Sequence, residues 1–215
     1  PYTILDFTDE RGEIGPMLLG DMGADVIKVE LERGCTSRKQ PPFFDAGEQR
    51  DLKSLNFHAF NRNKRSIVLD PESEADQKVL ELLIRKSHFV FEPSPNGTLA
   101  SFGLAYADVK ALNTQIVFVQ ISAFGVDGPY ADFVDSDLVI AAMGGPVSLQ
   151  GVADRAPVRV TVPQVWRHTG VEAAAGALAA HHRRLKTGAA QYVDLSAQNV
   201  LTWTMLNACL LYTSP

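Results

Sequence analysis

The chain has little of what marks several specialised classes of protein. Its 215 residues include only two cysteines, Cys35 and Cys209, which lie far apart with no CxxC pair beside them. That arrangement provides neither a disulfide framework nor a zinc site, so we expect a cytoplasmic protein without a metal. No apolar run approaches the roughly 20 residues of a membrane-spanning helix, and residues 1–3 do not resemble the basic start of a signal peptide. The sequence therefore predicts no membrane partner and no targeting segment.

An excess of charge of one sign is also missing. Twenty Lys and Arg residues against twenty-five Asp and Glu residues give a formal net charge of -5, and no long block of either sign occurs. A dedicated nucleic-acid surface is therefore not expected. Apolar residues make up 46% and charged residues 21% of the chain, which is close to the globular average and excludes disordered or collagen-like classes. At about 100 to 200 residues per domain, the length fits one large or two small domains.

Apolar runs that suit strands alternate with stretches of helical periodicity. The first half of the chain predicts strands at 2–7, 26–29, 66–69, 89–91 and 116–121, with helices between them near 16–22, 75–83 and 106–112. Pro16 suits the first turn of its helix, and Gly23 suits the residue after the last turn. Alternation of this kind predicts an α/β fold with a mostly parallel, open sheet and helices on both faces.

The second half of the chain has a glycine-rich loop and a long helix. Residues 123–135 are expected to leave the carboxyl end of the strand at 116–121, where ligands bind in such sheets, and Gly125 suits a close approach of the backbone to a ligand. The later elements are expected to be a helix at 137–143, an irregular stretch at 151–165, an Ala-rich helix at 167–186 ended by Gly188, a strand at 191–194 and a helix from Ser196 to Leu211.

Common catalytic motifs are absent. The sequence contains no GxxxxGK[ST], GxGxxG, HExxH or GxSxG, so it lacks support for a P-loop NTPase, a standard Rossmann dehydrogenase, a zincin or an α/β-hydrolase. His181 and His182 are adjacent on the Ala-rich helix and point in different directions, which fits a polar helix end better than a metal site.

Six segments in a fixed order carry a resemblance to a known family. They are LDFTDERG (5–12), LLGDMGADVIKVE (18–30), NRNKRSIVLD (61–70), FGLAYADVKALN (102–113), ISAFGVDGPYAD (121–132) and LKTGAAQYVDLSAQ (185–198). Together they resemble the class III CoA-transferases, which include formyl-CoA transferase and carnitine CoA-transferase, with α-methylacyl-CoA racemase as a relative. The resemblance covers nearly the whole chain.

The resemblance implies a particular architecture. Residues 1–215 would form the N-terminal part of a large α/β domain with a Rossmann-like sheet. The small domain and the C-terminal return would be supplied by sequence absent from this chain. The chain is therefore expected to be a fragment of a fold that forms an interlocked homodimer at full length.

The resemblance also implies a chemistry. In the family an aspartate attacks the acyl-CoA thioester, CoA returns to form an enzyme thioester, and an acceptor carboxylic acid takes the CoA. CoA and acyl-CoA are thus substrates, and no covalently bound cofactor is expected. The family aspartate stands four residues before the glycine that matches Gly170, and this position is Trp166 here. Indole donates one hydrogen bond and has no nucleophilic oxygen, so the catalytic residue is unknown.

Two nearby carboxylates are the candidates to replace the missing aspartate. The racemases have a His-Asp pair where this chain has Ser136 and Asp137. Asp137 opens a predicted helix, and such residues are more often caps than catalysts. Glu172 follows Trp166 by six residues, which places it about 240° further around the helix.

The expected CoA-binding residues are Arg11, Asn63, Lys64, Arg65 and Gly125. The resemblance places residues 63–65 at the family's N-x-N-K-R motif, which contacts the cofactor, and guanidinium and ammonium groups suit phosphate oxygens. The alternative is a solvated basic turn before a strand. Arg11 falls near a family residue that lines the thioester region. An arginine that supports CoA in the family is Ser101 here, a departure that predicts weaker or altered binding.

Two functions follow from these observations. The first is transfer of CoA between an acyl-CoA and a carboxylic acid. The second is a catalytically silent CoA-binding or assembly module of a longer, tandem protein, since Trp166 replaces the nucleophile. An unrelated nucleotide-binding α/β enzyme is a third reading, and the absence of every phosphate-loop motif weighs against it.

Overall fold

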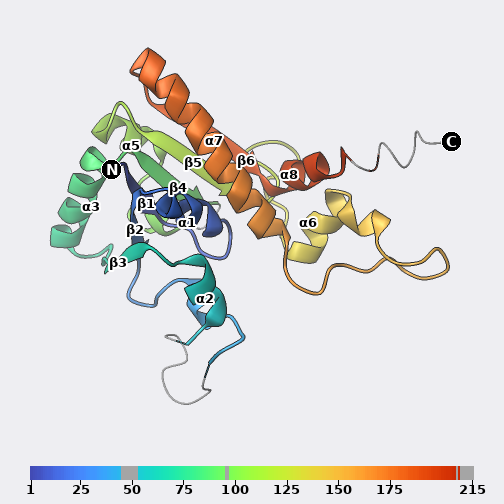
Figure 1. Cartoon of the computed structure of the whole chain (residues 1–215). Helices are drawn as coiled ribbons and strands as arrows, with labels where there is room; N and C mark the ends of the chain where they lie inside the picture. Colours follow the sequence, from blue (N-terminus) through green and yellow to red (C-terminus); the bar gives the residue numbers. More distant parts are fainter. Residues whose placement is uncertain (45–52, 95–96, 207, 209–215) are drawn as a thin grey trace.

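A computed structural model of the chain describes residues 1–44, 53–94, 97–206 and 208. Strands and helices alternate along it (Figure 1). The strands are β1 (Thr3–Asp6), β2 (Asp25–Glu30), β3 (Lys64–Val68), β4 (Phe89–Pro93), β5 (Val117–Ser122) and β6 (Gln191–Ser196). The helices are α1 (Ile14–Asp21), α2 (Leu55–Phe60), α3 (Glu74–Lys86), α4 (Thr98–Ser101), α5 (Tyr106–Leu112), α6 (Asp137–Met143), α7 (Val165–Thr187) and α8 (Ala197–Thr204), with 3₁₀ turns η1 (Thr36–Lys39) and η3 (Pro146–Leu149).

The six strands form one parallel sheet in the order β3-β2-β1-β4-β5-β6. The chain builds the sheet outward from β1 to β2 and β3, and then returns to place β4 on the other side of β1. The direction of strand order therefore reverses between β1 and β4, and ligands of open α/β sheets bind at the carboxyl end of such a reversal. The predicted fold class is confirmed.

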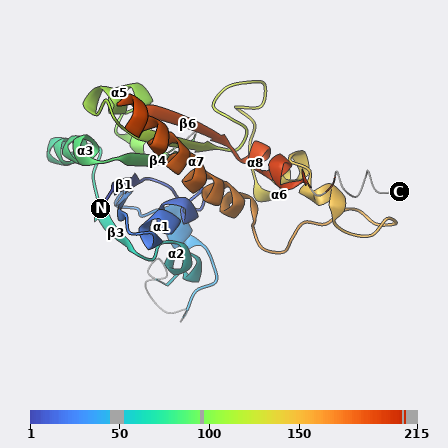
Figure 2. The same cartoon turned by 45° about the horizontal axis from the view of Figure 1, so that its top comes forward.

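Helices cover both faces of the sheet, with α1 and α7 on one face and α3 and α5 on the other (Figure 2). Successive residues of a strand point to opposite faces. Ile4 accordingly belongs to the core under α1 and α7, and Leu5 to the core under α3 and α5. Both are fully buried, which explains why the central strands are continuous apolar runs rather than alternating ones.

Two glycines let α1 and α7 approach each other closely. A Cβ atom on Gly15 would lie 2.6 Å from the carbonyl oxygen of Gly170, and one on Gly170 would overlap Ile14. Real Cβ atoms do not come that close to a backbone oxygen, so the pair sets the spacing of the helices. This packing brings the N-terminal half of α7 against the loop that follows β1.

Most predicted boundaries hold to within a few residues. Gly23 and Gly188 end their helices with φ values of 101° and 67°, the left-handed region that glycine favours. Helix α8 ends at Thr204 and a turn follows at Met205, whereas one continuous helix to Leu211 was predicted. Residues 206 and 208 are helical again, and positions 207 and 209–211 of that prediction lie outside the described residues. Helices α2 and α4 were not predicted. In the part of the chain that the structure describes, no helix is both long and apolar enough to cross a membrane.

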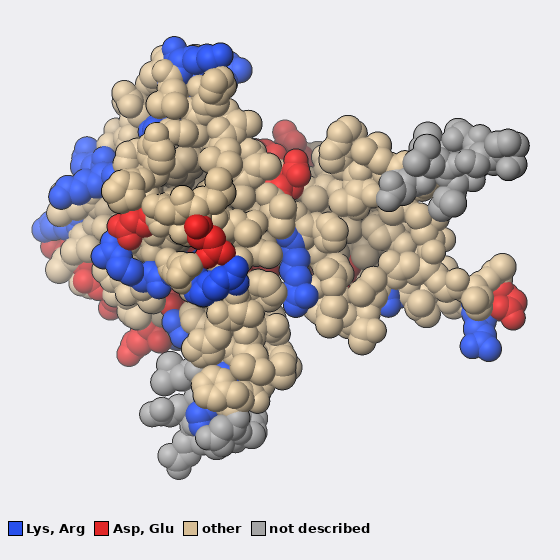
Figure 3. Space-filling view, in the orientation of Figure 1, with Lys and Arg blue, Asp and Glu red and all other residues tan. Residues whose placement is uncertain are grey.

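An extension leaves the sheet at the right of Figure 1. It consists of α6, residues 144–164 and α8. Charged side chains are interspersed over the α/β part of the molecule, whereas the visible face of the extension carries few of them (Figure 3). Several of its apolar side chains are exposed, including Val152 at 58% and Trp203 at 66%.

Candidate functional site

Polar side chains are buried at the carboxyl edge of the sheet. Asp6 of β1, Lys28 and Glu30 of β2 and Glu92 of β4 are each at most 4% exposed. Burying a charged or polar group costs free energy unless it is paired, so these residues mark an edge that is organised by specific contacts. Because β1 and β4 flank the reversal of strand order, the same edge is where the fold class predicts a ligand.

Asp6 is the centre of a buried ion network. Its Oδ2 lies 2.7 Å from Lys64 Nζ and 3.6 Å from Lys28 Nζ, and its Oδ1 accepts hydrogen bonds from the backbone and hydroxyl of Thr8. Burial opposes ionisation of Asp6, but the two lysines outweigh it and lower its pKa. Lys64 also donates to Glu13 O at 2.7 Å. The network thereby ties β1, β2 and β3 to both ends of the loop at residues 7–13.

This loop contributes side chains to two depressions. One, which we call the switch-point pocket, has a volume of about 400 Å³ and lies at the carboxyl ends of β1, β2 and β4. Its lining residues are Phe7, Asp9, Arg11, Glu30, Leu31, Arg33, Gly34, Cys35, Thr36, Lys39, Pro93, Gly97 and Thr98. The position agrees with the rule for open parallel sheets.

The carboxylates of the switch-point pocket are matched by arginines. Arg11 forms a salt bridge with Asp9 at 2.8 Å, and Arg38 forms one with Glu30 at 2.7 Å. Burial would raise the pKa of Glu30, but the hydrogen bonds from Arg38 and Ser66 lower it to about 2. Arg33 and Lys39 have no ion pair within the described ranges.

The second depression, which we call the tryptophan pocket, has a volume of about 290 Å³. It is lined by Glu10, Glu13, Ile14, Gln40, Asn56, Phe60, Asp135, Ser136, Asp137, Pro163, Trp166 and Arg167. Burial raises the pKa of both Glu10 and Glu13. Asn61 donates a hydrogen bond to Glu13 at 2.8 Å, so the more buried of these carboxyl groups is held in place.

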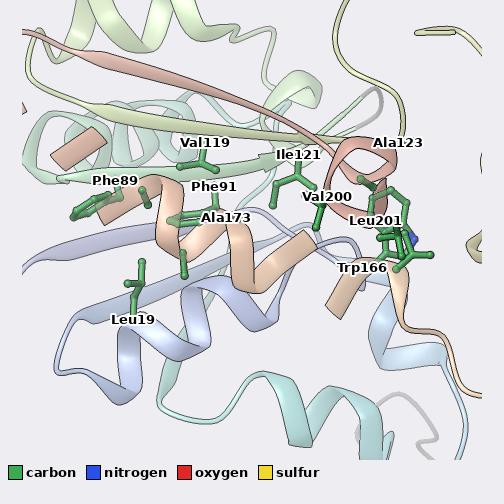
Figure 4. Packing of buried hydrophobic residues seen from close by; sticks show 14 of the residues in the cluster. Leu19, Phe89, Phe91, Val119, Ile121, Ala123, Trp166, Ala173, Val200 and Leu201 are labelled. Atoms are coloured by element: carbon green, nitrogen blue, oxygen red, sulfur yellow. The ribbon is translucent and has the colours of Figure 1, made fainter. Parts of the chain in front are cut away.

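Trp166 is part of the core as well as of this pocket. Its side chain is 9% exposed and belongs to the hydrophobic cluster beneath α7. Figure 4 shows it beside Leu201 and near Ala123 and Val200, at the start of α7. Trp166 is thus a packing residue that also lines the tryptophan pocket.

Asp137 is occupied in holding the start of α7. Its Oδ1 accepts hydrogen bonds from the backbone N–H groups of Gln164 at 3.0 Å and Val165 at 3.1 Å, and its Oδ2 pairs with Arg159 at 3.1 Å. The α6 N-cap is the hydroxyl of Ser136. The prediction that Asp137 caps its own helix is therefore wrong, because Ser136 does so; Asp137 instead accepts hydrogen bonds from the start of α7.

We expect Asp137→Ala to destabilise the protein by about 1–2 kcal/mol, because two N–H groups at the start of α7 lose their acceptor. Asp137→Asn keeps a carbonyl oxygen at the same place and is expected to cost less. Urea unfolding of the two variants measures the difference. Equal stability of Asp137→Ala and the unsubstituted protein would contradict the capping role.

The other residues predicted from the sequence do not all lie at the two pockets. Glu172 is exposed on α7 and lines neither pocket. Arg11 lines the switch-point pocket, and its contact with CoA stays a prediction. Gly125 has a φ of 101° and donates its N–H to Ser122 Oγ, but it lines neither pocket.

The basic turn at residues 63–65 has partners within the fold. Asn63 adopts a left-handed φ of 63° and donates to Asp21. Lys64 is the buried partner of Asp6, and Arg65 forms a two-bond contact with Asp25. None of the three lines either pocket, so their contact with CoA stays a prediction.

Sequence reasoning missed several residues of the switch-point pocket. Glu30, Arg33 and Lys39 were not singled out, although Glu30 ends β2 and the two cations follow it within nine residues. The available signal was their place after a parallel strand next to the reversal. No group of three or more His, Cys, Asp or Glu residues in the described chain could hold a metal ion.

Comparisons with known proteins agree with this architecture. The sequence model described as CoA-transferase family III matches residues 2–215. Succinate–glutarate CoA-transferase of Agrobacterium fabrum is 32% identical over 197 residues, covering 91% of this chain and 49% of that protein. Formyl-CoA:oxalate CoA-transferase of Streptomyces avermitilis is 35% identical, covering 96% of this chain and 48% of that protein. The chain thus spans about half the length of these relatives.

The crystal structure of a CAIB/BAIF family protein from Brucella suis superposes with a TM-score of 0.87 at 32% identity, covering 100% of this chain and 58% of that one.

Proposed function

Because the chain belongs to CoA-transferase family III, we propose that it binds CoA thioesters and serves the transfer of CoA between an acyl-CoA and a carboxylic acid. The observation that carries this proposal is the switch-point pocket. It lies at the carboxyl ends of three parallel strands and has cations at its rim. We assign the phosphate-bearing end of CoA to this pocket.

The charges of the pocket suit a phosphate ligand. Asp9 and Glu30 each form a salt bridge with an arginine. The positive charges of Arg33 and Lys39 can therefore attract an anionic ligand. Guanidinium groups offer paired donors to phosphate oxygens, and an ammonium group offers a mobile point charge. This assignment retains Arg11 from the expected ligand residues and adds two cations that sequence reasoning did not find.

The double variant Arg33→Ala/Lys39→Ala is expected to bind CoA more weakly, by about 1–3 kcal/mol for each charged hydrogen bond lost. Calorimetry on the full-length protein measures the affinity. Arg65→Ala is the matched control, because Arg65 is exposed and pairs with Asp25 away from both pockets. A loss with Arg65→Ala and none with the double variant would instead place the phosphates at the basic turn.

A catalytically silent CoA-binding module is the second candidate, and Trp166 is the observation that favours it. The indole has no lone pair free to attack a thioester. The neighbouring carboxylate of Asp137 is committed to the start of α7, and Glu172 faces solvent on α7. Neither of the two candidates lies free beside Trp166.

Covalent trapping separates the two candidates. We expect that full-length protein incubated with acyl-CoA and then with hydroxylamine or borohydride gives no adduct on the peptide that contains Trp166. Transfer of CoA between acids at roughly 1 to 1000 per second by a purified single-copy protein would exclude the silent module. Mass mapping of the trapped group would then identify the nucleophile.

We further propose that the extension contacts a partner subunit, as an interlocked homodimer requires. Its exposed apolar side chains, among them Val152 and Trp203, form the kind of surface that soluble proteins bury in interfaces. Sedimentation of the full-length protein tests this, and a monomeric mass at micromolar concentration would contradict it.

A further inference from the structure

One buried carboxyl group beside the switch-point pocket has no role in the assignments above. Glu92 lies near the end of β4 and is 4% exposed. Its Oε1 accepts the backbone N–H of Leu99 at 3.0 Å, but its Oε2 has no hydrogen-bond partner within the part of the chain that the structure describes. A buried polar atom without a partner costs stability, and such atoms in a native fold call for a functional explanation.

The carboxyl group supports one wall of the pocket. A Cβ atom on Gly97 would overlap the Glu92 carboxyl group and would lie 2.4 Å from Pro93 O. Residue 97 must therefore lack a side chain for the chain to pass directly over Glu92. Gly97, Thr98 and Pro93 line the switch-point pocket, so the wall that a ligand would meet rests on this carboxyl group.

The surroundings of Glu92 favour its protonated form. Burial raises its pKa well above the ordinary value, the backbone N–H groups of Leu99 and Ala100 act in the opposite direction, and Asp9 adds to the rise while Arg11 reduces it. Asp9 and Arg11 face it from the loop after β1. Strand β5 presents the neutral Gln120 opposite Glu92, and α4 contains no charged residue.

We propose that Glu92 is a positioning residue of the switch-point pocket: its protonated carboxyl group holds residues 97–100 over the end of β4, and binding of the anionic ligand is linked to this proton. Ionisation of Glu92 would place a buried negative charge beside a phosphate-bearing ligand. The carboxylate would then need further hydrogen-bond donors, and residues 97–100 would have to move to provide them. Affinity for the ligand therefore falls as Glu92 loses its proton. The inference rests on the proposed function for the identity of the ligand, which is CoA.

The pH profile of CoA affinity in the full-length protein tests the linkage. As the pH rises through the Glu92 pKa, the unsubstituted protein loses affinity for CoA, tenfold for each unit by which CoA binding raises that pKa. Glu92→Gln keeps the acceptor without a titrating proton, so this part of the pH dependence disappears. Glu81→Gln, at an exposed position of α3, is the matched control and follows the unsubstituted protein. An identical profile in Glu92→Gln and the unsubstituted protein would overturn the linkage.

Amide hydrogen exchange tests the positioning role without CoA. The N–H group of Leu99 exchanges faster in Glu92→Ala, which removes its acceptor, and at nearly the original rate in Glu92→Gln. Unchanged exchange in Glu92→Ala would overturn the positioning role. If no variant binds CoA at any pH, the proposed function and the linkage to the ligand both fail, and the exchange rates still decide whether Glu92 holds the wall.

Discussion

Replacing Asp6 with Ala is expected to destabilise the protein by about 3–5 kcal/mol, because it leaves two buried lysines without their shared counter-charge. Lys28 and Lys64 are 1% and 2% exposed at the side chain, and both face Asp6 Oδ2. A loss of this size is a large share of the 5–15 kcal/mol that stabilises a typical domain. Urea unfolding followed by circular dichroism measures it, and failure to accumulate folded protein is the extreme form of the same result.

The control for Asp6 is an ion pair of the same kind at the surface. Asp25 pairs with Arg65, whose side chain is 69% exposed, and exposed pairs are worth only about 0–1 kcal/mol. Asp25→Ala is therefore expected to be nearly neutral. Similar losses in the two variants would show that the buried network does not carry the stability assigned to it.

Replacing Trp166 with Ala is expected to cost about 3 kcal/mol, since the indole is largely buried and its removal leaves a cavity at the start of α7. Trp166→Asp is expected to cost at least as much, because it adds a carboxylate to the same partly apolar space. Thermal unfolding of both variants measures the loss. A carboxylate at position 166 is therefore expected to destabilise the start of α7, the helix that carries it.

Trp166→Phe is the matched control for that experiment. It keeps an aromatic ring in the cluster with Leu201 and Val200, so the loss should be clearly smaller than in Trp166→Ala. Stability that is unaffected by either substitution would contradict the packing role. It would also remove the physical objection to restoring a nucleophile at this position.

The sequence by itself determined the order of elements and the class of the sheet. Strands such as 116–121 are continuous apolar runs, and continuous runs joined by amphipathic helices leave little choice except a parallel sheet covered on both faces. Glycines such as Gly188 ended helices where predicted, because the left-handed backbone they adopt is a local property. That residue 166 is a tryptophan, which has no nucleophilic oxygen, was also evident, since it depends only on residue identity.

Short helices were decided by tertiary contacts. Helix α2 has six residues and α4 has four, which is too short for intrinsic propensity to form them in water. Helix α2 begins at Ser54, whose hydroxyl is held by Gln40 O at 2.6 Å, and α4 begins over the buried carboxyl group of Glu92. Neither support is local in the sense that periodicity can detect.

The placement of charges was likewise a tertiary outcome. Lys64 lies in a basic turn that a sequence pattern assigns to a ligand, yet it pairs with a residue 58 positions earlier because β1, β2 and β3 are neighbours in the sheet. The switch-point pocket unites residues from three strand ends in the same way. The sequence shows which residues carry a charge. Which buried charges form ion pairs depends on which strands become neighbours in the sheet. The cations that have no such ion pair, and so can bind a ligand, are therefore seen only in the folded structure.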